Sequence, residues 1–154
     1  MPATAARKPA MHLNHAEIER RLPHAGSMCF LDAVTSWDAQ NICCSAAAPA
    51  VGHPLMRGGK LSALVAIEYA AQATALHGTL LDASTIPKAG LLARLRGVDF
   101  HCLYFPENGQ SVTIKAKLSA RTVGGCAYFF DVSSAHHCIA SGYLLVALKL
   151  PAKQ

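Results

Sequence analysis

One long apolar segment constrains the fold of this chain more than any other feature. Residues 61–81 are dominated by Ala and Leu, which are strong helix formers, and apolar side chains lie on nearly every face of the helix they would form. A helix of this kind is expected to be buried on all sides. Glu68, Gln72 and His77 interrupt the apolar run, so it does not read as a membrane span. We therefore expect a central helix with the other elements wrapped around it.

The rest of the chain predicts strands. Residues 29–35 and 42–48 are rich in apolar side chains and are separated by a polar stretch, which is typical of a hairpin. Further along, Val, Ile, Phe and Tyr are enriched in four runs, which are residues 90–100, 111–121, 127–133 and 139–149. Strands and helices do not alternate regularly, so we expect the α+β class, with an antiparallel sheet of about six strands around one long central helix.

The length of 154 residues fits one domain with a hydrophobic core. We expect a flexible N-terminal tail over residues 1–12 and a single domain over residues 13–150. At the start of that domain, Asn14 is followed three residues later by Glu17, which predicts a capped short helix that ends at Leu22.

Composition limits the kinds of partner. The chain carries a net charge of +5 with a pI near 9.0, which favours an acidic partner. Lysines and arginines are spread along the sequence rather than clustered with aromatics, so we expect no nucleic-acid partner. There is no apolar secretory segment in residues 1–10, and we expect a soluble, cytoplasmic protein without a membrane partner. Its six cysteines have no C-x-x-C spacing and are expected to be buried free thiols in a reducing compartment.

A carboxyl group in the middle of the apolar helix is the most informative single residue. Folding alone would not place Glu68 there, because burying a charge is costly. Loss of water favours the protonated form of a carboxyl, which can then donate a proton as a general acid does. Gln72 lies one turn further on the same face and could hydrogen-bond Glu68 or a substrate. The alternative is an exposed carboxylate, or one paired with Lys60 or Arg57.

Two histidines are candidate partners for this carboxyl. His53 lies in a Gly- and Pro-rich loop that leads into the helix, so the fold could bring it near Glu68 of the same or a facing subunit. His24 lies between the first helix and the first strand. Either could equally be a surface or structural histidine. Residues 136–138, His-His-Cys, alternate across a strand and lack a second cluster with ligand spacing, so no metal site is expected.

Several segments resemble a known family. LPHAGSM (residues 22–28) runs into FLDAV (30–34), and GHP (52–54) precedes IEYAAQ (67–72). From about residue 21 to 148 the chain resembles the β-hydroxyacyl-acyl carrier protein dehydratases of the hot-dog fold. IEYAAQ followed by His77-Gly78 is most similar to the divergent branch encoded in aryl polyene and related polyketide-pigment pathways.

The resemblance implies dehydration of β-hydroxyacyl thioesters to enoyl thioesters in fatty-acid or polyketide-type biosynthesis. It implies that Glu68 is the catalytic acid and a histidine the base. His24 ranks slightly above His53, because Phe-Pro is missing after Gly52-His53 and the loop to Glu68 is one residue longer than usual. The substrate would arrive on the phosphopantetheine of an acyl carrier protein, with no other cofactor. A homodimer is expected, with another hot-dog subunit as the alternative partner.

Other functions on this fold stay open, because one scaffold hosts several chemistries. They are an acyl-thioester hydrolase, in which Glu68 would activate water, and a non-catalytic subunit that binds an acyl carrier. For a dehydratase, amides near residues 61–64 could hold the charge that develops on the thioester oxygen. The predicted substrate-binding residues are Gln72, Leu61, Leu64, Leu92 and Leu95, with Leu91 and Phe100 as further walls of an acyl tunnel. Candidate carrier contacts are Arg57, Lys60, Arg94 and Arg96.

Overall fold

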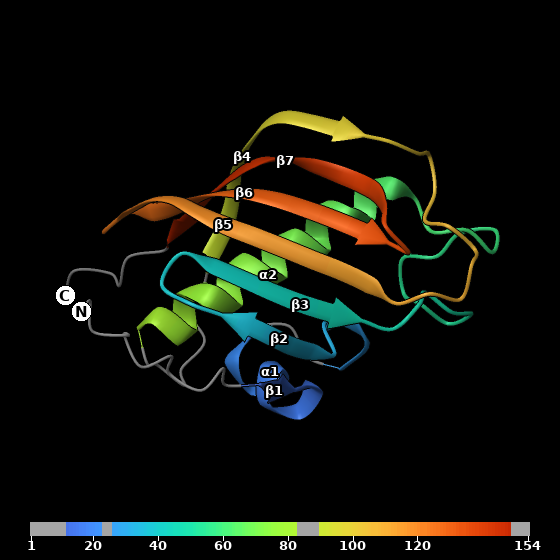
Figure 1. Ribbon diagram of the computed structural model, residues 1–154, viewed down its shortest axis with the longest axis horizontal. Coiled ribbons are helices and arrows are strands. Elements are labelled where there is room, and N and C mark those ends of the chain that lie inside the picture. The colour runs from blue at the N-terminus through green and yellow to red at the C-terminus, as the bar shows by residue number, and fades with distance from the viewer. Residues whose placement is uncertain (1–11, 23–25, 83–89, 149–154) are drawn as a thin grey trace, which may run out of the picture.

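The computed structural model describes residues 12–22, 26–82 and 90–148, and within them the chain forms one sheet and one long helix (Figure 1). The strands are β1 (Leu13–Asn14), β2 (Ala33–Trp37), β3 (Asn41–Ala46), β4 (Gly90–Phe100), β5 (Val112–Thr122), β6 (Gly125–Ser134) and β7 (His137–Leu148). The helices are α1 (His15–Arg21) and α2 (Ala66–Leu81), with 3-10 turns η1 (Gly26–Met28) and η2 (Ala63–Val65).

The sheet is antiparallel in the order β1-β2-β3-β5-β6-β7-β4, and it curves around α2 (Figure 1). This is the predicted α+β hot-dog architecture. The two-residue β1 adds a seventh strand to the six that the sequence predicts. In this order β4 lies at one edge of the sheet, where it pairs with β7.

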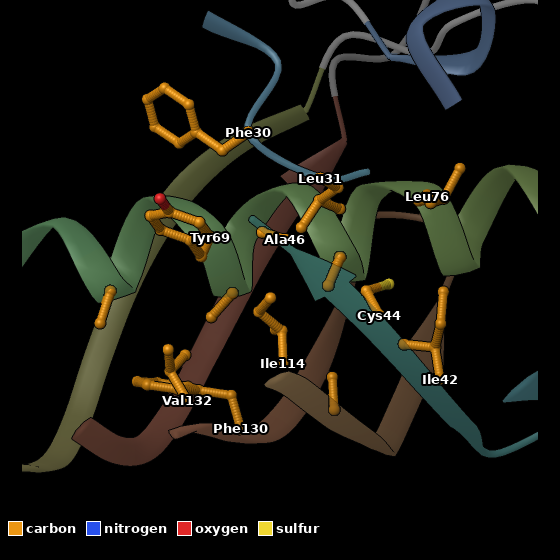
Figure 2. Packing of buried hydrophobic residues seen from close by; sticks show 14 of the residues in the cluster. Phe30, Leu31, Ile42, Cys44, Ala46, Tyr69, Leu76, Ile114, Phe130 and Val132 are labelled. Carbon is orange, nitrogen blue, oxygen red and sulfur yellow. The ribbon is translucent and has the colours of Figure 1, made fainter. Parts of the chain in front are cut away.

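The core lies between α2 and the inner face of the sheet (Figure 2). Ala66, Ala70 and Ala73 are buried on the helix, and their small side chains let it approach the strands closely. Alternate residues of β3 point to the helix, since Ile42 and Cys44 are buried and their neighbours are not. Burial of apolar side chains in this layer is the main stabilising contribution to the fold.

The long helix begins later than predicted. The sequence indicates residue 61, but α2 begins at Ala66, after η2. The reason is a tertiary contact. The Leu61 carbonyl accepts from the Phe105 amide at 2.8 Å, and the Ala63 amide donates to the Leu103 carbonyl at 2.9 Å, so this stretch pairs with a distant loop instead of continuing the helix. Ser62 then caps the turn by accepting from the Leu64 amide at 3.2 Å.

The prediction that the helix is buried on every face is wrong for the single chain. Leu64 in η2 is 64% exposed. Positions on α2 spaced three or four residues apart stay partly exposed. These are Ile67, Glu68, Ala71, Ala75, Gly78 and Leu81. The sheet and the segment before β2 cover the remainder of the helix, and one stripe of it is left partly open.

The first long strand also begins later than predicted, at Ala33 instead of residue 29. Phe30 is buried and its amide donates to the Gln72 side chain at 3.0 Å, so this segment packs on α2 and not in a strand ladder. The N-cap prediction is confirmed, because Asn14 accepts from the Glu17 amide at 3.0 Å. The six cysteines are free thiols, but only three of the six are buried as predicted, which are Cys29, Cys44 and Cys126. Residues 1–11 lie outside the described part, so the predicted tail and domain boundaries stay predictions.

Candidate active site

Glu68 lies in the first turn of α2, and Gln72, one turn later, holds it. The Gln72 side chain is 0% exposed and its amide is used entirely within the chain. Its Oε1 accepts from the Phe30 amide at 3.0 Å, and its Nε2 donates to the Met28 carbonyl at 2.8 Å and to Glu68 Oε1 at 3.4 Å. The predicted hydrogen bond between Gln72 and Glu68 is therefore present, whereas a contact of Gln72 with a substrate stays a prediction. Glu68 as a residue is half-buried rather than enclosed.

His53 lies in the loop between β3 and η2, after Gly52, whose φ of +99° suits glycine. The histidine is half-buried, with its ring centroid 4.6 Å from that of Phe30. Its Nε2 lies 3.2 Å from the hydroxyl oxygen of Tyr69, and its Nδ1 accepts from the Leu55 amide at 3.2 Å. Burial lowers the pKa of His53, so the ring is neutral at neutral pH. The structure thus brings His53 to Tyr69, the residue that follows Glu68.

A cavity of about 240 Å³ opens beside this histidine. Phe30, Asp32, His53 and Tyr69 line it, together with residues 47–52. The Tyr69 side chain is 2% exposed, and Figure 2 shows its hydroxyl directed to the side where Phe30 lies. Burial, with a smaller contribution from the Asp32 carboxylate, raises the pKa of Tyr69, so its hydroxyl stays protonated. The cavity therefore combines apolar walls with a hydroxyl, an imidazole and a carboxylate.

The other predicted site residues are distributed over different environments. Leu61 is 2% exposed and belongs to the core, whereas Leu64 and Leu95 are 64% and 37% exposed. Leu92 lies in β4, but its side chain is outside the described part, as is His24 altogether. The substrate contacts and the base role predicted for these residues stay predictions.

The backbone amides predicted to stabilise an oxyanion are partly occupied. The Ala63 amide donates to the Leu103 carbonyl, and the Leu64 amide donates to Ser62 Oγ. Both donors lie in the range 61–64 that was expected to be free for a thioester oxygen. They are occupied because η2, and not a free α-helical N-terminus, precedes α2.

Of the basic residues predicted to contact a carrier, Arg57 and Lys60 have partners within the chain. The guanidinium of Arg57 donates to two carbonyls of its own loop, at 3.0 and 2.8 Å. The ammonium of Lys60 lies 4.9 Å from the ring centroid of Tyr104, a cation–π contact. Arg94 and Arg96 are exposed on β4. A contact of any of them with a carrier protein stays a prediction.

Tyr69 is the site residue that the sequence analysis missed. A signal was available, because a tyrosine in a buried, Ala-rich helix needs a hydrogen-bond partner for its hydroxyl. His77 was noted only as part of a family motif. It is 0% exposed, its Nδ1 lies 2.7 Å from the Tyr128 hydroxyl, and its Nε2 lies 2.8 Å from the Asp38 carbonyl. That network ties α2 to the sheet.

Among the described residues, no three His, Cys, Asp or Glu side chains are grouped so that they could hold a metal ion. Within the same part of the chain, no helix is long and apolar enough to cross a membrane. The cytoplasmic location stays a prediction.

The antiparallel sheet around one long helix defines a hot-dog protein. Near the start of that helix lie a carboxyl, a histidine and a tyrosine, which are groups suited to acid–base chemistry. The family model described as ApeP-like, ApeP dehydratase, matches residues 16–151, and the chain belongs to this family of dehydratases. This confirms the divergent, aryl polyene type of hot-dog dehydratase that the sequence resembles. Among curated proteins no sequence matches significantly.

Solved structures share the fold. A chain of the dehydratase heterocomplex ApeI:P from Xenorhabdus doucetiae is 21% identical, with a TM-score of 0.78 over 86% of this chain and 91% of that one. A hypothetical thioesterase with coenzyme A from Streptococcus pneumoniae is 10% identical, with a TM-score of 0.57 over 75% and 84% of the two chains. A mutant thioesterase from Pseudomonas aeruginosa is 11% identical, with a TM-score of 0.56 over 75% and 78%.

Proposed function

We propose that this protein removes water from β-hydroxyacyl thioesters carried on an acyl carrier protein, giving enoyl thioesters in fatty-acid or polyketide-type biosynthesis. The observation that carries the proposal is Glu68, a carboxyl held half-buried on α2 by a fully buried glutamine in a chain of the dehydratase family. Folding does not need a carboxyl at that position, and a site for general acid catalysis does.

The reaction needs a base to remove the proton next to the thioester carbonyl and an acid to protonate the departing hydroxyl. In this proposal Glu68 is the acid, and His24 or His53 is the base. The lowered pKa of His53 supports a neutral imidazole at working pH, as a base requires. The substrate arrives on phosphopantetheine, and the proposed chemistry requires no further cofactor.

A second hot-dog subunit is proposed to complete the site. The edge strand β4 carries Leu95 and Phe100, which are 37% and 40% exposed, and an edge strand offers backbone groups to a partner strand. The dehydratase ApeI:P from Xenorhabdus doucetiae, which shares this fold, is a heterocomplex, and this supports a different hot-dog chain as the partner. A homodimer is the alternative, and coexpression followed by light scattering on the purified complex distinguishes the two.

The net charge of +5 supports an acidic carrier as the source of the substrate. Arg94 and Arg96 on β4 and Lys60 near the start of α2 are the exposed cations proposed to contact it. Such contacts weaken as salt rises, so the apparent KM for carrier-bound substrate is expected to increase with ionic strength.

The test is ultraviolet absorbance of the conjugated enoyl thioester, formed from a β-hydroxyacyl-acyl carrier protein by the full chain, alone and with its hot-dog partner. Glu68→Gln is expected to lower the rate by about 10²- to 10⁴-fold, the usual contribution of a general acid. Glu17→Gln, on α1, is the matched control and is expected to leave the rate unchanged.

Two other outcomes would contradict the proposal. Release of free thiol without enoyl product would identify a thioester hydrolase, in which Glu68 activates water. Binding of the acyl carrier without either product, and unchanged in Glu68→Gln, would identify a non-catalytic subunit.

A further inference from the structure

The hydrogen of the Tyr69 hydroxyl has no acceptor among the described residues, and the reason lies in the neighbouring histidine. A backbone amide can only donate, so the Leu55 N–H makes His53 Nδ1 an acceptor. A neutral imidazole has one proton, which must therefore be on Nε2. Nε2–H then donates to the hydroxyl oxygen of Tyr69 at 3.2 Å.

This arrangement leaves Tyr69 as a donor without an acceptor. Within the described part of the chain, the His53 ring is the one hydrogen-bond partner of its hydroxyl. The side chain is 2% exposed, and it lines the 240 Å³ cavity. Buried polar groups are nearly always hydrogen-bonded, so an acceptor in this cavity is expected beside the hydroxyl, a water when the cavity is empty and a ligand atom when it is filled.

The charge in the cavity indicates which kind of acceptor fits. The Asp32 carboxylate lines the same cavity, and its Oδ2 accepts from the Ala47 amide at 2.6 Å. Asp32 is exposed and its Oδ1 lies 3.5 Å from His15 Nδ1, so solvent and the histidine weaken its field in the cavity. Its charge therefore disfavours a ligand with a full negative charge, such as a carboxylate or phosphate, more than a carbonyl oxygen on which charge develops only partly and during the reaction. The apolar ring of Phe30 and the small side chains of residues 47–50 suit a ligand that is otherwise uncharged.

The chemistry of the proposed reaction supplies such an oxygen. Removal of the proton next to a thioester carbonyl places negative charge on the carbonyl oxygen, which needs a hydrogen-bond donor. The Ala63 and Leu64 amides, where such donors were expected, are already bonded within the chain.

We propose that Tyr69 is the donor that stabilises this oxygen: its hydroxyl, oriented by His53 Nε2–H, hydrogen-bonds the carbonyl oxygen of a thioester bound in the cavity. The inference rests on the proposed function for the identity of the substrate. It makes His53 a positioning residue, because neither of its nitrogens has a free lone pair, and it leaves the base role to another group, for which His24 is the candidate.

The experiment is infrared difference spectroscopy of butyryl-pantetheine with a ¹³C-labelled carbonyl, bound to the full chain. This probe has no β-hydroxyl and cannot be dehydrated, so the spectrum reports hydrogen bonding independently of turnover. The carbonyl band is expected to move to lower frequency in the native protein and to return to its position in water-free solvent in Tyr69→Phe. His53→Gln, which keeps an N–H donor, is expected to retain the shift better than His53→Ala.

Tyr128→Phe is the matched control, because it also removes a hydroxyl that contacts a histidine but lies at the other end of α2. It is expected to leave the band in its shifted position. In kinetics with β-hydroxyacyl thioester, Tyr69→Phe is expected to lower kcat by about 100-fold or more with little change in KM, as removal of an oxyanion donor does.

The outcomes for Tyr69 and for the proposed function are distinguishable. A shifted band that depends on Tyr69, in a protein without dehydratase activity, would support the donor and contradict the reaction. An unshifted band, a shift retained in Tyr69→Phe, or no binding of the probe would overturn the donor role even if dehydration by Glu68 is observed.

Discussion

Two histidine–tyrosine pairs lie at opposite ends of α2, and the helix contributes the tyrosine to one and the histidine to the other. Near its start, Tyr69 of α2 contacts His53 of a loop. Near its end, His77 of α2 contacts Tyr128 of β6. Burial lowers the pKa of both histidines and raises the pKa of both tyrosines.

The pairs differ in which nitrogen faces the tyrosine. The Asp38 carbonyl can only accept, so the proton of neutral His77 is on Nε2, and Nδ1 accepts from the Tyr128 hydroxyl. Both ring nitrogens of His77 and the hydroxyl hydrogen of Tyr128 are used inside the protein, and His77 is 0% exposed. In the other pair the tyrosine accepts and keeps its own hydrogen for the cavity. A histidine and a tyrosine can therefore form a contact that is satisfied within the protein, or one that leaves the tyrosine hydrogen available to a ligand. Which of the two forms depends on whether the backbone group against the imidazole is a carbonyl, as at His77, or an amide, as at His53.

The largest effect on stability is expected from His77→Ala. This change leaves the Tyr128 hydroxyl and the Asp38 carbonyl unsatisfied and creates a cavity, so the free energy of unfolding should fall by about 3 kcal/mol. His53→Ala, at a half-buried position open to water, should cost about 1 kcal/mol or less. Urea unfolding measures both, and equal losses would contradict the assignment of the His77 pair to structure and the His53 pair to a site.

Acid should destabilise the protein through His77. Its folded pKa is lowered and its unfolded pKa is near 6.5, so the unfolded state binds the proton first as pH falls. The contribution of His77 to stability is therefore complete above about pH 6.5 and decreases below it, by up to about 1.4 kcal/mol per pH unit. Unfolding free energies between pH 7 and 5.5 test this. The slope should be smaller in His77→Gln than in the native protein, and also smaller in His53→Gln, because burial lowers the pKa of both histidines. An unchanged slope in His77→Gln would contradict this contribution.

Removing one hydroxyl at a time should give a smaller difference. Tyr128→Phe leaves the buried Nδ1 of His77 without a donor, which should cost about 1 to 2 kcal/mol of unfolding free energy. Tyr69→Phe leaves His53 Nε2–H facing the cavity, where water can accept from it, so the loss should be about 0.5 kcal/mol. Thermal unfolding of the two variants compares them directly. A greater loss in Tyr69→Phe would mean that Tyr69 serves mainly to stabilise the fold.

The smallest expected effect concerns which ring nitrogen of His53 and of His77 carries the proton, and it involves no change in stability. Both neutral rings are expected to carry the proton on Nε2, which long-range ¹H–¹⁵N spectra at pH 7.5 report through the shifts of the two ring nitrogens. Tyr69→Phe should change the Nε2 shift of His53, and Tyr128→Phe should change the Nδ1 shift of His77. A proton on Nδ1 of His53 would contradict the orientation inferred for the Tyr69 hydroxyl.

Much of the fold could be predicted from local patterns. The Asn14 cap, the long helix and the order of six strands follow from side-chain periodicity and turn residues, which act over a few neighbouring positions. The beginnings of α2 and β2 could not, because backbone groups of Leu61 and Phe30 bind partners far away in the sequence. Glu68 was recognisable as a site residue because a carboxyl in an apolar helix stands out against its neighbours.

By itself, then, the sequence determined the fold class, the family resemblance and the unusual carboxyl at Glu68. Only the tertiary structure decided three hydrogen bonds. Gln72 bonds to the segment before β2, Tyr69 bonds to His53, and His77 bonds to Tyr128. The physical reason is that helices and strands follow from local spacing, whereas a hydrogen bond depends on where distant donors and acceptors meet. The role of each histidine depends on whether a backbone amide or a carbonyl lies against its ring.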